Sequence, residues 1–434
     1  MTVDYIFRGS AADLDPQLSA VVDLEDIRQE EKIILVASES MAPAAVRELM
    51  ASNFANVYAE GYPRSASRKQ SEPAILDLDF ELAHYRRYSD PRYYKGVEFA
   101  DIIEALARRR AAELFSANSI SPEDLYVNVQ PLSGSPANIA AYSALLEPGD
   151  KIMGLDLKHG GHLTHGSKVS RSGILYEAIP YTVDQETEQL DFDAIETLAM
   201  EQRPKLIVAG FTAYPLFVEW TRFREIADQC GAYLMADIAH ISGLVAAGLH
   251  PSPIGIADIV TTTTHKSLCG PRGAMIMTHR EDLARKIDRA VFPGEQGGPH
   301  LNTIAALALA LKLANTDKFR ALQARVVANA SRLAVKLSEA GLRVVAGGTK
   351  NHLLLVDTKS VSHNGNVLSG DMAARILDVA GIVTNSNTIP GDRTAFSASG
   401  IRMGTVWISQ LGFADKEIDL LAEAIALSAN PSWL

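Results

Sequence analysis

Residues 258–266 read DIVTTTTHK, a run of β-branched and apolar side chains that ends on His265 and Lys266. Such a run favours a buried strand. In wound α/β sheets, ligands collect at the carboxyl ends of the strands. A lysine held there, partly desolvated and beside other cations, has an amine activated for Schiff-base chemistry, although an isolated lysine in a loop is usually a solvated one.

Short apolar runs alternate with helical stretches on both sides of this segment. From about residue 125 to residue 277 the pattern is that of a βα-wound sheet rather than a helical bundle. Near-continuous apolar strands suit a parallel sheet that is covered on both faces. We therefore expect an α/β fold with a mostly parallel wound sheet in a large domain. The expected strands are 125–129, 151–155, 205–210, 232–236, 258–264 and 274–277.

An acid follows the strand that precedes the lysine-bearing one. Asp237 comes directly after the expected strand 232–236, and Lys266 follows the next strand. A carboxylate in that place can keep a pyridine nitrogen protonated, which makes pyridoxal phosphate an effective electron sink. Alone, Asp237 would more often be a helix cap. Its pairing with Lys266 is what indicates a pyridoxal-phosphate enzyme.

A glycine and serine turn at Ser133-Gly134-Ser135 offers a third signal. We expect Ser135 to be the N-cap of a helix, Pro136 its first residue, and 147–150 (EPGD) its end. Free backbone N–H groups and hydroxyls at such a turn can hold a phosphate, although any capped helix looks similar. No GxGxxG turn follows the first strand, so a nicotinamide cofactor is disfavoured.

The C-terminal part has a different pattern. A long helical region over 301–340 is followed by expected strands at 342–346 and 352–356 and a helix near 371–380. These elements predict a smaller α+β domain. We place an N-terminal arm at 1–40, the large pyridoxal-phosphate-binding domain at 41–315 and the small domain at 316–434.

Composition narrows the function classes. The chain has 434 residues, of which 47% are hydrophobic and 21% charged, which argues against disorder. Its formal net charge of -11 argues against a general nucleic-acid binder. Cys230 and Cys269 form neither a disulfide framework nor a zinc pair, and no signal peptide or bilayer-spanning run is evident. We expect a cytoplasmic protein without a metal site, a nucleic-acid partner or a membrane segment.

The sequence resembles the serine (glycine) hydroxymethyltransferases, which are fold-type I pyridoxal-phosphate transferases, from Arg28 to about Phe413. This resemblance implies an enzyme that makes or breaks the Cα–Cβ bond of a β-hydroxy amino acid, converting serine to glycine with tetrahydrofolate as the one-carbon acceptor. The matching motifs are ASES (37–40), YAEGYP (58–63), RYY (92–94), NVQPLSGSPAN (128–138), GGHLTHG (160–166), DIAH (237–240), TTTTHKSLCGPRG (261–273), FPGEQGGP (292–299), NHLLLVD (351–357) and SGIRMGT (399–405).

The resemblance also implies the cofactor contacts. Lys266 would carry the cofactor as a Schiff base, Asp237 would pair with its pyridine nitrogen, and His162 would stack on its ring. The remaining contacts, to the phosphate, the phenolic oxygen and their surroundings, would come from Ser133, Gly134, Ser135, Thr212, His240, His265 and, from a neighbouring chain, Gly298.

Substrate contacts and a dimer follow from the same resemblance. Arg402 would take the substrate carboxylate as a bidentate fork, assisted by Ser38. Glu60, with Tyr58 and Tyr94, would reach into the neighbouring subunit's site, which implies a homodimer with shared active sites. Glu60 would shuttle a proton at the substrate hydroxyl, and Tyr94 would also contact the substrate. The implied folate contacts are Leu157, Gly161, Leu163, Asn351 and Phe396.

The largest departure from the family pattern is an insertion. The family usually joins GYP and RYY through a very short turn, whereas here residues 64–91 intervene and are expected to alter the substrate or folate entrance. Smaller departures lie at Ser40, Leu132, Thr212 and 394–396. They leave the cofactor residues in place and open the question of substrate identity.

Three alternatives therefore stand beside the serine enzyme. An α-methylserine hydroxymethyltransferase, or a folate-independent α-methylserine or threonine-type aldolase, needs room for one methyl group, a difference of about 1–3 kcal/mol. A silent homologue predicts loss of Lys266, Asp237 or Arg402, and all three are present. An aminotransferase predicts conversion of the bound cofactor to its amine form.

Overall fold

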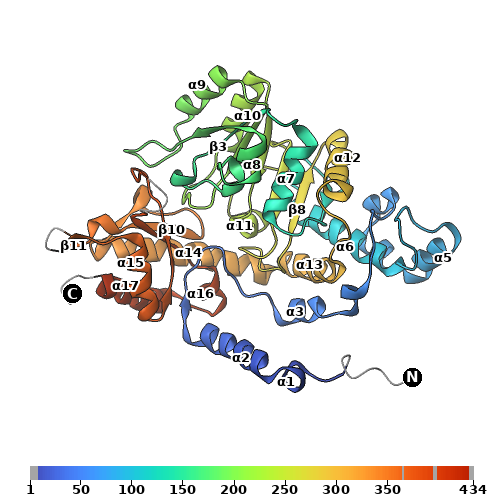
Figure 1. Ribbon diagram of the computed structural model, residues 1–434, viewed down its shortest axis with the longest axis horizontal. Coiled ribbons are helices and arrows are strands. Elements are labelled where there is room, and N and C mark those ends of the chain that lie inside the picture. Colours follow the sequence, from blue (N-terminus) through green and yellow to red (C-terminus); the bar gives the residue numbers. More distant parts are fainter. Residues whose placement is uncertain (1–7, 364–365, 394–397, 430–434) are drawn as a thin grey trace.

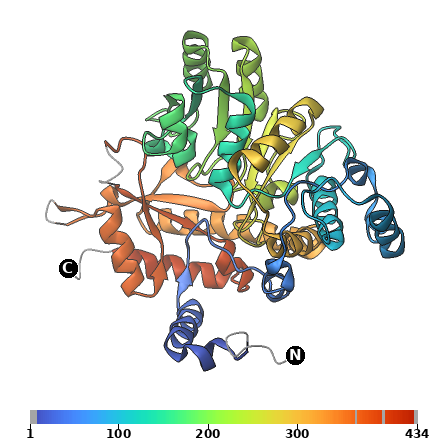
Figure 2. The same cartoon turned by 45° about the vertical axis from the view of Figure 1, so that its right-hand side comes forward.

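The computed structural model describes residues 8–363, 366–393 and 398–429. In Figure 1 a wound sheet with its helices occupies the upper part, and the C-terminal elements, in orange and red, lie at the lower left. The N-terminal helices α1 (Ala11–Leu14) and α2 (Pro16–Glu31) extend along the bottom, and α5 (Leu78–Tyr88) projects at the right. Figure 2 shows the same arrangement after a turn of 45°.

A seven-stranded sheet forms the centre of the large part. Five strands that lie side by side, β4, β3, β5, β6 and β7, are parallel to one another. Strand β8 runs antiparallel to its two neighbours, β7 and β2. The order across the sheet is β2 (Tyr126–Asn128), β8 (Ala274–Thr278), β7 (Ile259–Thr263), β6 (Tyr233–Asp237), β5 (Leu206–Gly210), β3 (Lys151–Leu155) and β4 (Glu177–Tyr181).

The expected mostly parallel sheet is confirmed. Each expected strand is found to within one residue at either end. Strand β4 was not expected, because it is an edge strand with an exposed Glu177 and with Pro180, which cannot donate to a ladder. It therefore does not read as a buried apolar run.

Both faces of the sheet are buried, which explains the continuous apolar strands. In β5, Leu206 and Val208 face a core shared with α7 (Gly134–Leu145) and α12 (Glu281–Arg289), while Ile207 and Ala209 face the opposite core. That second core includes apolar residues of α6 (Glu98–Phe115), α9 (Phe192–Gln202), α10 (Trp220–Cys230) and α13 (Leu301–Ala314).

The start of α7 corrects one expectation. The N-cap is Ser133, not Ser135, and the helix begins at Gly134, so Pro136 is its third residue rather than its first. The first turn of a helix has N–H groups without intrahelical partners, so a proline at the third position breaks no hydrogen bond. The helix ends at Leu145, just before 147–150.

The smaller part is α+β, as expected. Its antiparallel sheet has the order β14 (Asn385–Asn387), β15 (Gly400–Gly404), β10 (Leu353–Asp357) and β9 (Arg343–Val344). The helices around its core are α14 (Asp317–Glu339), α15 (Gly370–Val379) and α17 (Asp415–Ala429). The helical region 301–340 is two helices, because the Thr316 side chain caps α14 by accepting from the Phe319 N–H.

The N-terminal segment is attached to this part. Strand β1 (Ile33–Ile34) pairs in parallel with β13 (Ile382–Val383). The remaining elements are α3 (Ala44–Met50), α4 (Glu72–Ile75), α8 (Arg171–Leu175), α11 (Ser242–Ala246), α16 (Val406–Gln410), β11 (Ser362–His363) and β12 (Asn366–Val367).

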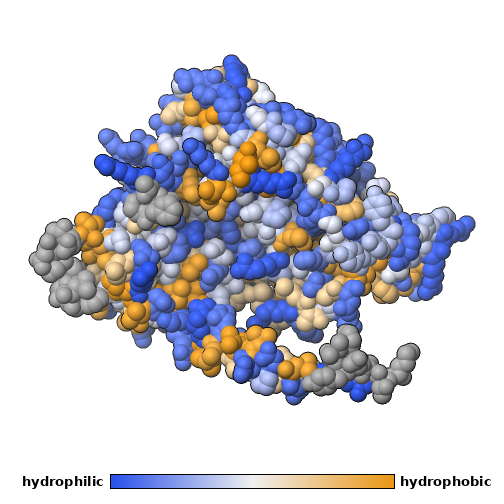
Figure 3. Space-filling model, in the orientation of Figure 1, coloured by the Kyte–Doolittle hydropathy of each residue, from blue (hydrophilic) through white to orange (hydrophobic). Residues whose placement is uncertain are grey.

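Three α-helices of the described residues, α1, α2 and α5, have no buried residue. Helix α2 has no buried residue and carries exposed apolar side chains from Leu18 to Ile27, seen as orange patches at the bottom of Figure 3. Helix α5, inside the insertion, has no buried residue either. Across the described ranges, no helix combines the length and apolar character required to cross a membrane.

Candidate active site

A cavity of about 200 Å³ lies at the carboxyl ends of β5, β6 and β7, beside the start of α7. Its lining brings together sequence-distant residues that follow neighbouring strands. The expected residues that line it are Ser133, Gly134, Ser135, His162, Thr212, Asp237, His240, His265 and Lys266.

Asp237, the last residue of β6, is held as a carboxylate. Its Oδ2 accepts a hydrogen bond from Asn138 Nδ2 at 2.8 Å and lies 3.0 Å from His165 Nε2. Burial alone would raise the pKa of Asp237, but these contacts hold it below its usual range. The neighbouring strand approaches closely: a Cβ on Gly210 would lie 2.6 Å from the Asp237 Cβ. Only glycine therefore fits at the end of β5.

Lys266 lies in the same cavity and has a weakened hold on its proton. Burial lowers the pKa of its amine to about 8. The positive charges of Arg402 and Arg272 also lower this pKa, whereas the negative charge of Asp237 raises it. A larger fraction of the amine is therefore neutral near pH 8 than in a solvated lysine. A neutral amine is the form that attacks a carbonyl group.

The start of α7 can hold a phosphate. The Ser133 side chain makes no capping hydrogen bond, so its hydroxyl is left for a ligand together with the free N–H groups of the first turn. A Cβ on Gly134 would lie 2.8 Å from Thr263 Cγ2, so the backbone needs glycine there. His265 also lines the cavity, and no group in the described ranges pairs with its buried Nδ1.

Two neutral histidines complete the cavity wall. Burial lowers the pKa of His162 to about 4, and its Nδ1 lies 2.7 Å from Thr164 Oγ1. Burial also holds the pKa of His240 far below its usual range, and its Nδ1 has no partner among the described residues. The lysine, the carboxylate, the helix start and the flat neutral rings fit pyridoxal phosphate.

The side chain of Arg402, in the middle of β15, is held in place by two hydrogen bonds within the chain. Its Nη1 donates to the Thr212 carbonyl at 2.8 Å and its Nε donates to Asn385 Oδ1 at 3.2 Å. Burial lowers the pKa of its guanidinium to about 10, so it remains charged at neutral pH. The Thr212 hydroxyl is also engaged, because it donates to the Gly161 carbonyl at 2.9 Å.

Tyr58, Glu60, Tyr94 and Gly298 do not line this cavity. A Cβ on Gly297 would lie 3.1 Å from Glu60 Oε1, and one on Gly298 would lie 3.0 Å from the Tyr58 ring. The rings of Tyr58 and Tyr94 are 5.5 Å apart, with 61% and 45% of these residues exposed. The four residues therefore gather on a separate, open surface of the chain.

Ser38 lies on a second cavity of about 490 Å³, which shares His265 and Arg272 with the first. Of the expected folate contacts, Gly161 and Asn351 are both hydrogen-bonded to the segment 212–214. Asn351 is buried, and its Nδ2 donates to the Tyr214 carbonyl at 2.9 Å. Leu163 is exposed, and Gly161 packs against Leu155. Leu157 begins a short 3₁₀ turn, and Phe396 lies outside the described residues.

Sequence reasoning missed the residues that hold the predicted ones. Asn138 and His165 contact Asp237, and the His352 ring stacks on His240 with centroids 5.7 Å apart. His352 Nε2 also lies 3.2 Å from the Ala37 carbonyl, next to Ser38. Asn138 offered one signal, since it is an amide in the apolar helix that follows the glycine turn. His352 offered none apart from its motif.

A buried lysine and an ionised acid at adjacent strand ends, facing a helix start, define the chain as a fold-type I pyridoxal-phosphate enzyme. The sequence model of the serine hydroxymethyltransferase family matches residues 11–72 and 82–425. The serine hydroxymethyltransferase of Desulfotalea psychrophila is 48% identical over 417 residues, which cover 96% of this chain and 89% of that relative. The chain therefore belongs to the serine hydroxymethyltransferase family.

This membership confirms the predicted class of reaction. The chain is a pyridoxal-phosphate-dependent transferase of one-carbon groups, with tetrahydrofolate as co-substrate, and the α-methylserine alternative is not favoured. The family match stops at residue 72 and resumes at residue 82, so within the expected insertion 64–91 only residues 73–81 lie outside the family model.

Proposed function

We propose that Lys266, Asp237 and Arg402 carry the transfer of the hydroxymethyl carbon of serine to tetrahydrofolate. The observation that supports this proposal best is the joint presence of Lys266 and Asp237 in one cavity of about 200 Å³ beside the start of α7. When bound, pyridoxal phosphate supplies a charged ring that takes up the electrons of the bond broken at the α-carbon.

The chain's own groups divide the work around that ring. Asp237, kept ionised by Asn138 and His165, would hold the proton on the pyridine nitrogen. Lys266 would hold the cofactor through its amine. Ser133, Gly134, Ser135 and His265 would contact the phosphate, with Gly298 from the partner, and His162, Thr212 and His240 would contact the ring.

Arg402 and Ser38 set which bond breaks. A planar guanidinium binds a carboxylate through two parallel hydrogen bonds, so Arg402 fixes the direction of the substrate carboxylate. A carboxylate fixed in this way would set which bond of the α-carbon is presented for cleavage, here the bond to the hydroxymethyl group. Leu157, Gly161, Leu163, Asn351 and Phe396 are the proposed folate contacts.

We also propose a homodimer in which Tyr58, Glu60 and Tyr94 complete the partner's site. Support comes from their place on an open surface, away from the cofactor cavity of their own chain. Glu60 would move a proton at the substrate hydroxyl there. The proposed domains are the arm 1–40, the large domain 41–315 and the small domain 316–434.

Mixing two inactive variants tests the shared sites. Lys266→Ala and Glu60→Gln chains are unfolded, mixed and refolded together. If Glu60 acts across the interface, one site of each mixed dimer combines an intact Lys266 with an intact Glu60, and activity returns. If mixed dimers form and stay inactive, Glu60 acts in its own chain and the proposal is wrong.

The folate requirement separates the transferase from the aldolases. We expect glycine formation from L-serine to depend on tetrahydrofolate, with only slow folate-free cleavage of other β-hydroxy amino acids and little turnover of α-methyl-L-serine. Glycine formed at one rate with and without folate would contradict a hydroxymethyl transfer.

We propose a cytoplasmic location, because Cys230 and Cys269 are both free thiols. Cell fractionation with an antibody to the protein tests this location.

A further inference from the structure

The insertion 64–91 lies between the loops that carry Glu60 and Tyr94. It folds into a 3₁₀ turn (Ser65–Lys69), α4 and α5, and it is fastened to itself and to α6 by ion pairs. Arg64 Nη2 lies 2.6 Å from Glu81 Oε1, and Arg110 Nη2 of α6 lies 2.6 Å from Glu72 Oε1. The segment is therefore an ordered part of the fold although α5 buries no residue.

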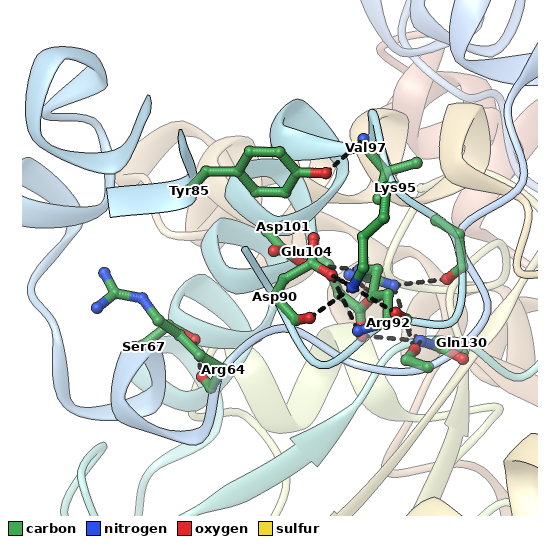
Figure 4. A network of polar contacts seen from close by, with 12 residues as sticks. Arg64, Ser67, Tyr85, Asp90, Arg92, Lys95, Val97, Asp101, Glu104 and Gln130 are labelled. Carbon is green, nitrogen blue, oxygen red and sulfur yellow. Dashed lines mark hydrogen bonds and ion pairs between the residues drawn. The ribbon is translucent and has the colours of Figure 1, made fainter. Parts of the chain in front are cut away.

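Tyr85, on α5, contacts the chain just beyond Tyr94. Its hydroxyl accepts hydrogen bonds from the Gly96 N–H at 2.7 Å and the Val97 N–H at 3.3 Å, and Figure 4 shows it directed at this backbone. Val97 is the N-cap of α6, and its own side chain makes no capping bond. Tyr85 thus supplies an acceptor to the two N–H groups that directly precede the helix.

The loop 90–97 is also closed on itself and joined to Glu60. Lys95 Nζ donates to the Asp90 carbonyl at 2.8 Å and to the Arg92 carbonyl at 2.9 Å. The Tyr93 N–H donates to the Glu60 carbonyl at 3.0 Å. Figure 4 shows Arg92 at the centre of these contacts. The loop is therefore joined to the Glu60 backbone at Tyr93 and to Tyr85 at Gly96, and Tyr94 lies between these two attachments.

Arg92 makes this linkage stiff. Its guanidinium is buried, donates to the carbonyl of Ala59 at 2.7 Å and of Gly61 at 3.2 Å, and pairs with Glu104 Oε2 at 2.8 Å. The two carbonyls flank Glu60, so its backbone is fixed on both sides. At the other end of the loop the Val97 side chain is buried in the core, and Tyr85 accepts hydrogen bonds from the Gly96 and Val97 N–H groups.

We propose that Tyr85 is a positioning residue for the reaction: by accepting from Gly96 and Val97, it fixes the loop that presents Tyr94 to the partner's site. This inference rests on the proposed role of Tyr94. It gives the segment 64–91 a task in the transfer reaction, because Tyr85 of this segment reaches the Gly96 and Val97 N–H groups.

Tyr85→Phe removes the hydroxyl and keeps the ring. Tyr88→Phe is the matched control, because Tyr88 lies on the same helix, is 64% exposed, and within the described residues its ring contacts only His84 and Arg87. We expect Tyr85→Phe to speed amide hydrogen exchange at Gly96 and Val97 and to lower kcat, each by about fivefold, which corresponds to one net hydrogen bond. Tyr88→Phe should change neither.

A double variant shows whether Tyr85 acts through Tyr94. In a Tyr94→Phe enzyme, adding Tyr85→Phe should lower kcat by less than about twofold, because coupled residues are not additive. Unchanged exchange at Gly96 and Val97, or faster exchange with an unchanged kcat, would overturn the proposed role of Tyr85. A fully active Tyr94→Phe enzyme would instead overturn the role of Tyr94 in the proposed function.

Discussion

The cofactor cavity and the surface formed by Tyr58, Glu60 and Tyr94 belong to one chain but are built differently. The cavity is enclosed by strand ends and a helix start, and its acid and lysine are both more than half buried. The other surface consists of loops whose tyrosines are largely exposed. A sheet fixes the cavity within one chain, whereas the tyrosines of these loops are left exposed by their own chain.

The largest effect is expected for the cavity. Lys266→Ala removes the amine that holds the cofactor, so serine turnover should fall about 10³-fold or more. The imine absorbance of the bound cofactor should be lost as well. Full activity in this variant would mean that the cavity is not where the reaction occurs.

Asp237→Asn tests the ionised acid with little change in shape. Loss of the negative charge opposite the pyridine nitrogen should lower kcat by about 10²- to 10³-fold. Steady-state kinetics of the variant with cofactor bound measure this. A decrease of less than about twofold would show that the carboxylate does not act on the ring.

Glu60→Gln tests the open surface. Removing a positioned proton carrier should lower kcat by about 10²-fold, while the imine absorbance of the bound cofactor is retained because Lys266, which would form the imine, is unchanged. Comparison of the spectrum and the rate in one preparation checks both points. If the spectrum changes as it does in the Lys266 variant, the two regions are not separate.

The smallest effect is a shift in pH dependence. Because the pKa of Lys266 is lowered to about 8, its neutral amine becomes abundant as pH rises through 8 rather than through the ordinary lysine range. The rate of cofactor uptake by the apoprotein should therefore level off at lower pH than imine formation with a free lysine derivative. Imine formation with the free lysine derivative is the control, because the cofactor ionises in the same way in both reactions. Equal pH profiles for the apoprotein and the free derivative would exclude a lowered pKa of Lys266.

Much of the cavity was predictable because its parts follow strands. Asp237 and Lys266 stand directly after apolar runs, and parallel strands bring their carboxyl ends to one edge. Their partners Asn138, His165 and His352 come from separate parts of the chain, and a buried hydrogen bond leaves no local pattern. Strand β4 was missed for the same reason, since its pairing with β3 lies outside its own sequence.

The open surface was predictable only through resemblance. Glu60 reads as an ordinary loop acid, and nothing near it has a helical or strand period. The insertion 64–91 shows no clean period either, because α5 buries no face and is held by side-chain contacts such as those of Arg64 and Tyr85. Patterns of apolar residues report burial, and here there is little burial to report.

The pairing of β1 with β13 ties substrate recognition to the C-terminal part. The Gly404 N–H donates to the Leu35 carbonyl at 2.7 Å, and a Cβ on Gly404 would lie 2.4 Å from the Ala37 Cα. Ser38 therefore travels with the strand that carries Arg402. A rotation of the C-terminal part would therefore move Ser38 and Arg402, the two proposed contacts of the substrate carboxylate, together.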